Sequence, residues 1–265
     1  MTKTVKNGGL RNSLVTTHYP QLATPNSVAS GRCWSLLGGV RTILPWVLLF
    51  AVAAGAQERV LQADDFTGDL SQWAVEQQPG GTVRVEHGRL VIADAAGCTV
   101  WFRPRLTAPV VITYEATLSP ASRVSDLNCF WMAREAAHSD EPPYARAHAR
   151  DGRFAAYDSL LTYYVGYGGN TNSTTRFRRY DGQGARPLRA EHDLRDPRFL
   201  LIAGHTYRIT LTVTAGGHVQ FLRDGEVVFD FHDPQPLTSG WFAFRTVHSQ
   251  MEVAHFRVSR PVENH

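Results

Sequence analysis

Residues 207–231 have the sequence YRITLTVTAGGHVQFLRDGEVVFDF, three runs of alternating apolar and polar residues separated by two glycine-containing turns. Alternation at period two is typical of strands with one buried face. Asp224-Gly225 supplies the positive φ angles of a type I′ turn, and Ala215-Gly216-Gly217 joins the preceding pair of runs. The segment therefore predicts a three-stranded antiparallel meander.

The same pattern continues through the rest of residues 57–265. Runs rich in Val, Ile, Thr, Tyr and Phe are bounded by Gly, Pro and Asp, and no convincing amphipathic helix interrupts them. Strands are predicted at 83–86, 89–93, 98–103, 110–118, 127–134, 160–167, 173–180, 207–214, 218–223, 226–231, 240–247 and 251–259. Twelve strands in about 209 residues favour an all-β jelly-roll sandwich of two antiparallel sheets, kept as one domain. Two long polar stretches, 135–157 and 181–199, are predicted loops that wall a binding groove.

Residues 1–56 differ in charge from the rest of the chain. They hold five of the 27 basic side chains and no Asp or Glu, whereas residues 57–265 hold the other 22, all arginine, and all 24 acidic side chains. The net charge of the larger part is therefore about −2, which gives little support to a protein that coats nucleic acid. We expect no nucleic-acid partner.

The end of this first segment has the three parts of a signal peptide. Arg41 precedes the apolar run 43–53, and Ala54-Gly55-Ala56 provides a small-residue cleavage site. A membrane anchor is the alternative, but crossing a bilayer takes about 20 apolar residues. We predict that residues 1–56 are removed and that residues 57–265 form a single secreted or periplasmic domain. This domain is expected to be a monomer with no stable membrane insertion.

Export would leave two cysteines, Cys98 and Cys129. An oxidising compartment permits one disulfide between them. Both lie in apolar runs, so two separate buried thiols are an equal alternative. No spacing of a zinc site, phosphate-binding loop, dinucleotide fingerprint or nucleophile elbow is present.

Several motifs resemble those of a known family. Residues 65–73 (DFTGDLSQW) and the meander resemble concanavalin-A-like jelly rolls. Residues 126–133 (DLNCFWMA), with 163–170 (YYVGYGGN) and 174–180 (TTRFRRY), resemble an uncharacterised subgroup of bacterial secreted proteins related to the 3-keto-disaccharide hydrolase domain. The resemblance covers essentially all of residues 57–265 and implies the fold, but it transfers no activity. The tyrosines also resemble the groove strand of jelly-roll alginate lyases, although the Lys of that motif is absent and no Gln-x-His strand accompanies it.

The central block carries the strongest candidates for a site. Alternate side chains share a face on a strand, so Arg176, Arg178 and Tyr180 lie together, and Tyr164 shares its face with Gly166 and a second glycine. Glycine leaves room for a sugar ring, Tyr offers a stacking surface, and Arg can clamp a carboxylate. The alternative is a solvated face on which Arg stems cover tyrosines. We favour a carbohydrate-binding groove.

Further candidates lie outside this block. Asn128 interrupts an apolar run and shares a face with Met132; it is either a ligand contact or a core amide with a partner. His248 follows a predicted strand and is a catalytic candidate or a structural histidine. Asn170 and Arg245 complete the predicted substrate-binding set.

The absence of paired carboxylates narrows the chemistry. Retaining glycosidases need two carboxylates about 5 Å apart, and no strand carries the Glu-x-Asp-x-x-Glu spacing that this fold uses for them. A lyase acting on a uronic acid needs a group that neutralises the carboxylate and a Tyr or His that moves protons. Arg176 or Arg178, with Asn128, would bind the carboxylate. Tyr164 or Tyr167 would act as base and acid.

The leading hypothesis is an exported enzyme that cleaves a glycan by β-elimination or an unusual hydrolysis. A non-catalytic carbohydrate-binding module using the same groove is the alternative from another class. Hydrolysis of a modified 3-keto disaccharide, which the resemblance implies, is the third. No cofactor is expected. A structural Ca²⁺ is an alternative, although the sequence shows no loop of ligands that would hold it.

Overall fold

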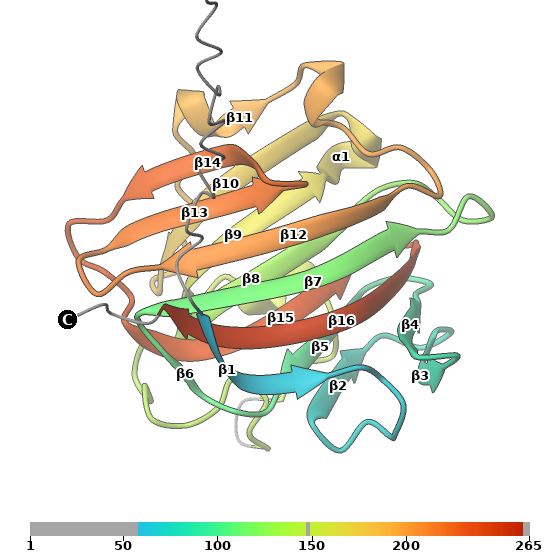
Figure 1. The fold of residues 1–265 in the computed structure, drawn as a ribbon, viewed down its shortest axis with the longest axis horizontal. Coiled ribbons are helices and arrows are strands. Elements are labelled where there is room, and N and C mark those ends of the chain that lie inside the picture. Colours follow the sequence, from blue (N-terminus) through green and yellow to red (C-terminus); the bar gives the residue numbers. More distant parts are fainter. Residues whose placement is uncertain (1–57, 147–148, 262–265) are drawn as a thin grey trace, which may run out of the picture. The chain divides into compact units, whose positions relative to one another are not determined.

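The computed structural model describes residues 58–146 and 149–261, and within these ranges the chain forms two antiparallel sheets of eight strands each (Figure 1). The first sheet has the order β14 (Glu226–His232), β13 (His218–Arg223), β12 (Thr206–Val213), β7 (Val110–Leu118), β16 (Gln250–Pro261), β4 (Arg89–Ala93) and β3 (Thr82–Glu86), with β1 (Glu58–Asp64) paired to β16. The second has the order β11 (Asp193–Leu194), β10 (Thr174–Asp181), β9 (Leu160–Gly168), β8 (Asn128–Glu135), β15 (Ser239–Thr246), β5 (Cys98–Phe102) and β2 (Trp73–Gln77), with β6 (Leu106–Thr107) paired to β15. The helical segments are short: η1 (Phe154–Tyr157), α1 (Gly169–Asn172), η2 (Ala190–His192) and η3 (Pro197–Phe199).

The predicted meander is present as β12, β13 and β14, which are neighbours in the first sheet. Its second turn has positive φ at both central residues, 53° at Asp224 and 84° at Gly225. These are the signs that a type I′ turn requires. The all-β, two-sheet prediction is confirmed.

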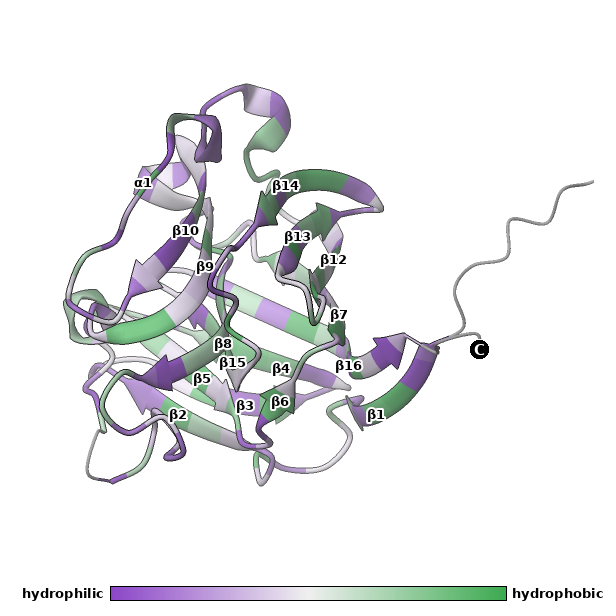
Figure 2. Cartoon of the chain, turned by 90° about the vertical axis from the view of Figure 1, so that its left-hand side faces the viewer, coloured by the Kyte–Doolittle hydropathy of each residue, from purple (hydrophilic) through white to green (hydrophobic). Residues whose placement is uncertain are grey.

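One side of each sheet faces a common core, and Figure 2 shows the two layers side by side. Trp73 of β2 and Phe244 of β15 stack at 5.3 Å between ring centroids, and Phe256 of β16 meets Trp73 edge-on at 5.1 Å. These rings join the two sheets. Each large apolar side chain buried in this way contributes about 1.5–3 kcal/mol.

The outer face of the second sheet carries a second apolar cluster. Phe130 of β8 lies 4.9 Å from Tyr164 of β9 and 5.5 Å from Tyr157 of η1, measured between ring centroids. The described residues between β8 and β9, 136–146 and 149–159, therefore contribute a layer over this face, and the middle strands of the sheet are covered on both sides.

A bulge in β8 overturns one expected side-chain direction. The register between β8 and its two neighbours shifts around Met132, which has a φ of 52°. The backbone of Gly240 lies so close that an added Cβ would be 2.3 Å from the Met132 carbonyl carbon. Because of this bulge, Met132 packs between the two sheets and does not share the face of Asn128.

Cys98 and Cys129 are free thiols, both buried. Cys98 lies opposite Thr246 and Cys129 opposite Phe244, so the two cysteines are on either side of β15. Strands are spaced about 4.8 Å apart, which puts the two Cα atoms roughly 10 Å apart, whereas a disulfide spans at most about 7 Å. The structure has the second arrangement, two separate buried thiols.

No helix in the described part of the chain has the length and apolarity to cross a membrane. The predicted leader and its cleavage site lie outside the described residues.

Candidate functional site

The outer face of the second sheet carries two rows of side chains that cross its strands side by side. The strand registers place one residue of each strand in each row. The polar row consists of Arg176, Gly166, Asn128, Arg245, Thr99 and Glu76. The apolar row consists of Arg178, Tyr164, Phe130, Ala243, Trp101 and Ala74. A polar strip therefore runs from β10 to β2 beside a strip that is apolar from β9 to β2 and carries Arg178 at its β10 end.

A cavity of about 570 Å³ opens over the end of these rows at β9 and β10. Its lining residues are Asp126, Phe154, Tyr164, Gly166, Gly169, Asn170, Thr174, Arg176, Arg178 and Arg186. Four predicted site residues thus come together here: Tyr164, Asn170, Arg176 and Arg178. Phe154 comes from the first predicted long loop and Arg186 from the second, as expected for loops that wall a groove.

The three arginines of the cavity differ in their partners. Arg176 binds Asp193 through Nε (2.7 Å) and Nη2 (3.3 Å). Arg186 lies 3.4 Å from Asp158. Arg178 has no acidic partner within 4 Å among the described residues, and its Nη1 donates to the carbonyl oxygen of Arg186. Burial lowers the pKa of Arg178, but a guanidinium keeps its charge in proteins. Arg178 therefore gives the cavity a positive charge without a local counter-charge.

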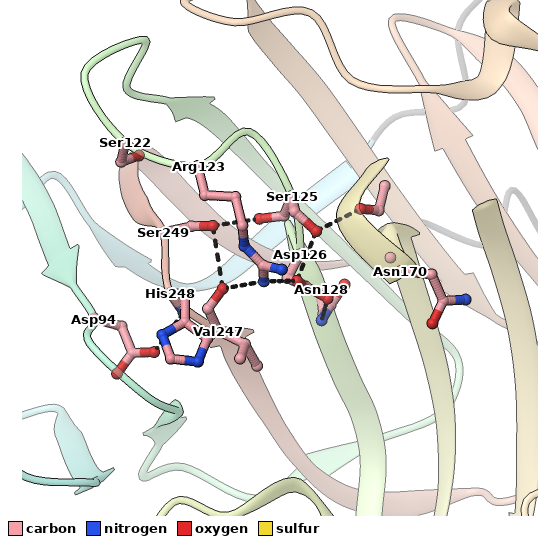
Figure 3. A network of polar contacts seen from close by, with 12 residues as sticks. Asp94, Ser122, Arg123, Ser125, Asp126, Asn128, Asn170, Val247, His248 and Ser249 are labelled. Atoms are coloured by element: carbon pink, nitrogen blue, oxygen red, sulfur yellow. Dashed lines mark hydrogen bonds and ion pairs between the residues drawn. The ribbon is translucent and has the colours of Figure 1, made fainter. Parts of the chain in front are cut away.

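The carboxylate that lines the cavity, Asp126, is already engaged. It forms an ion pair with Arg123 and accepts a 2.7 Å hydrogen bond from Ser125 (Figure 3). Its other oxygen accepts a bond from Asn128 Nδ2 at 3.2 Å. Because Arg123 neutralises Asp126, this carboxylate does not cancel the charge of Arg178.

Tyr164 occupies the space that glycine was expected to leave for a sugar. A Cβ placed on Gly166 would lie 3.2 Å from both Cε1 and Oη of Tyr164, so the tyrosine ring lies along its own strand over Gly166. Burial raises the pKa of Tyr164 well above its usual value. Its phenol is therefore protonated at neutral pH and suited to donating a hydrogen bond rather than to accepting a proton.

Three predicted site residues lie away from the cavity. Tyr167 points into the core between the sheets, because alternation along β9 puts it opposite to Tyr164, and its hydroxyl accepts a bond from Arg223. Tyr180 is on the outer face but fully buried against Phe130.

His248 lies in an exposed turn, where its backbone N–H donates to Asp94. Figure 3 shows it on the far side of Arg123 from Asn170. Neither His248 nor Tyr167 is placed to act in the cavity.

Asn128 and Arg245 belong to the polar row but are buried beside the cavity, 2% and 1% exposed. Sequence reasoning missed Phe154, Arg186 and Asp126 as lining residues. The two loop residues follow no strand periodicity, and only the unusual lengths of their loops indicated a role. No group of three or more His, Cys, Asp or Glu side chains in the described residues is placed to hold a metal ion.

Comparisons with solved structures support the sandwich. A Bacillus subtilis protein of unknown function with a galectin-like fold is 17% identical with a TM-score of 0.61, covering 78% of this chain and 100% of its own. The carbohydrate-binding module CBM66 from Bacillus subtilis is 11% identical (TM-score 0.50), covering 71% and 94%. The endo-β-1,3-glucanase from Pyrococcus furiosus is 12% identical (TM-score 0.52), covering 80% and 97%. At these identities the likeness establishes the fold alone, the concanavalin-A-like sandwich.

No curated protein matches the sequence. A family model does match, over residues 92–256. This range includes every residue that lines the cavity, and all residues of the two rows except those of β2. The chain therefore belongs to the family described as domain of unknown function DUF6250.

Proposed function

We propose that the protein is exported and that its cavity binds an acidic carbohydrate. The observation that carries this proposal is the guanidinium of Arg178, which has no acidic partner among the described residues, in a cavity that Phe154 and Tyr164 also line. Arginine takes carboxylates through two parallel hydrogen bonds, and aromatic rings beside it offer a surface for a sugar ring. The fold, shared with a carbohydrate-binding module and a glucanase, is compatible with this role.

The geometry favours recognition over hydrolysis by paired carboxylates. Such hydrolysis needs two carboxyl groups facing one bond, one of them able to donate or accept a proton. Asp126 is the single carboxylate among the residues that line the cavity. It is paired with Arg123 and accepts a hydrogen bond from Ser125, so its charge is neutralised and its orientation is fixed. A binding site needs no such pair.

A β-eliminating lyase is the second candidate, because Tyr164 lies opposite Arg178 in the sheet and lines the same cavity. In that reaction Arg178 would hold the uronate carboxylate, and Tyr164 would have to remove the α-proton and protonate the leaving oxygen. The raised pKa of Tyr164 suits the second step and opposes the first. Hydrolysis of a 3-keto disaccharide remains a hypothesis from the family resemblance.

The first test compares Arg178→Ala with Arg84→Ala, which removes an exposed arginine of β3 remote from the cavity. Calorimetric titration uses uronic-acid oligosaccharides and neutral oligosaccharides of equal length. A charged hydrogen bond contributes about 1.5–3 kcal/mol, so R178A should weaken acidic binding roughly 10- to 100-fold, whereas R84A should leave it unchanged. Equal binding of neutral sugars, or no effect of R178A, would contradict the proposal.

Tyr164→Phe then separates binding from elimination, because it keeps the ring and removes the proton. A binding site should retain most of its affinity. A lyase should lose the absorbance of its unsaturated product while still binding substrate.

A further inference from the structure

Arg245 is a buried cation that has no acidic partner in the part of the chain that the structure describes. Its side chain is 1% exposed, and no carboxylate of the described residues lies within 4 Å of its nitrogens. Nη1 donates to Thr99 Oγ1 (2.8 Å) and to the Gly152 carbonyl (3.0 Å), whereas Nε is buried with no hydrogen-bond partner. Glu76, the carboxylate of the same row, lies beyond Thr99 and bonds to other groups. Burying a charge with an unfilled donor is unfavourable, so this position is incomplete by itself.

The residue next to Arg245 in the polar row is also incomplete. Asn128 is 2% exposed, and its Nδ2 donates to Asp126, but its Oδ1 is buried and no described residue donates a hydrogen bond to it. An unfilled donor and an unfilled acceptor therefore lie on adjacent strands. Along the same row come Gly166 and Arg176 of the cavity, so Arg245 is three strand spacings, about 14 Å, from Arg176.

Phe154 lines the cavity and also contacts Arg245. Its ring centroid is 4.9 Å from the guanidinium carbon of Arg245, 4.9 Å from that of Arg186, and 5.5 Å from the Tyr164 ring. Phe154 belongs to the three-residue-per-turn helix η1 in a loop and is only half-buried. Cation–π contacts from Phe154 and Tyr157 are the partners that Arg245 has in place of a carboxylate.

We propose that the binding groove continues beneath Phe154, and that Arg245 and Asn128 form a second anion position for another acidic sugar of the same glycan chain. This inference rests on the proposed function. Displacement of the Phe154 ring would let a carboxylate reach Arg245, while Asn128 Oδ1 accepts a hydrogen bond from a sugar hydroxyl. The ligand class is then an oligosaccharide with repeated carboxylates rather than a single acidic sugar.

The experiment measures how affinity depends on ligand length. Calorimetry with oligogalacturonates of two and six units gives the ratio of the two Kd values for the wild type, for Phe154→Ala and for Phe154→Leu, which keeps an apolar cover. F154A should raise the preference for the hexamer at least fivefold over the wild type, because the second position is uncovered, and F154L should not. The ratio cancels any loss of stacking that both ligands share.

A second substitution identifies the groups responsible. In the F154A background, Arg245→Met and, separately, Asn128→Leu should return the length preference to the wild-type value. If R245M fails to fold, N128L still decides. An unchanged ratio in F154A, with acidic oligosaccharides bound, overturns the second position alone. Absence of binding by any acidic oligosaccharide overturns the proposed function together with this extension.

Discussion

Tyr164 and Gly166 act as one unit on the outer face of β9. The tyrosine ring lies close along the strand over Gly166, with both Cε1 and Oη 3.2 Å from where a Cβ would stand, a tighter contact than most side chains make. The ring is thereby held beside Arg178, its cross-strand neighbour. The glycine thus leaves room for the position of an aromatic side chain that lines the cavity.

Substituting Gly166→Ala should displace the Tyr164 ring. Contacts of 3.2 Å force neighbours to move, and overpacking of this kind costs about 1–3 kcal/mol. Denaturant unfolding should reveal that loss, and titration with an acidic oligosaccharide should reveal weaker binding. Gly216→Ala is the matched control, because nothing lies within 4 Å of its added Cβ. Equal stability of the two variants would contradict the proposed fit.

At this scale the sequence predicted the strand residues of the site and Asn170, which lies in the short segment α1 directly after β9. Alternation correctly grouped Tyr164, Arg176 and Arg178, because side-chain direction along a strand follows from residue number. The same rule puts Tyr167 on the opposite face, so its proposed role beside Tyr164 was inconsistent with the pattern. Phe154 and Arg186 come from loops, whose path depends on tertiary contacts.

Among the elements, η2 closes one open edge of the sandwich. Its His192 lies between the sheets, with ring centroids 4.9 Å from Phe177 of β10 and 5.8 Å from both Phe229 and Phe231 of β14. All three contacts are edge-on. Burial lowers the pKa of His192, with Glu191 opposing and Arg189 reinforcing the shift.

This pKa shift makes stability depend on pH. In the unfolded chain His192 takes up a proton at a pH of about 6.5, whereas in the folded state its lowered pKa keeps it neutral to lower pH. The free energy of unfolding therefore falls as the pH decreases below about 6.5. His192→Phe keeps the ring contacts without the titration, and its urea midpoint should fall less than that of the wild type between pH 7.5 and 5.5. His87→Gln, at an exposed turn, should behave like the wild type. If H192F and wild type lose equal stability, His192 is not the source.

Most strands were predictable from their apolar alternation, but β2 was missed although Trp73 and Glu76 are buried. β1 was not predicted because six of its seven residues are exposed, so its sequence shows no alternation of buried and exposed positions. The bulge at Met132 was not predicted because it depends on the close approach of Gly240, which is more than a hundred residues away in the sequence. The alternation of apolar and polar residues therefore predicted most strands, whereas the irregular backbone at Met132 could be seen only in the assembled sheet.

For the whole molecule, residues 1–56 lack acidic side chains, unlike residues 57–265, and we predict that they are cleaved off. Exported protein should begin at Gln57, because Ala54-Gly55-Ala56 follows a signal-like apolar run. Intact mass spectrometry of secreted and membrane fractions measures this. Ala56→Leu should block cleavage as a control. A membrane-bound protein that retains residues 1–56 would show that the run is an anchor.

The layer over the outer face of the second sheet has a consequence for how the molecule opens. Glu76 of β2 accepts bonds from the Tyr157 hydroxyl and the backbone N–H of Arg150, which tie this layer to the sheet through the Glu76 side chain rather than through strand pairing. Local unfolding of the layer breaks few backbone hydrogen bonds of either sheet. Its amides should therefore exchange with solvent as a separate cooperative unit, while β8, β9 and β15 stay protected. The free energy of that opening, rather than the global free energy of unfolding, would set how readily a long ligand reaches Arg245.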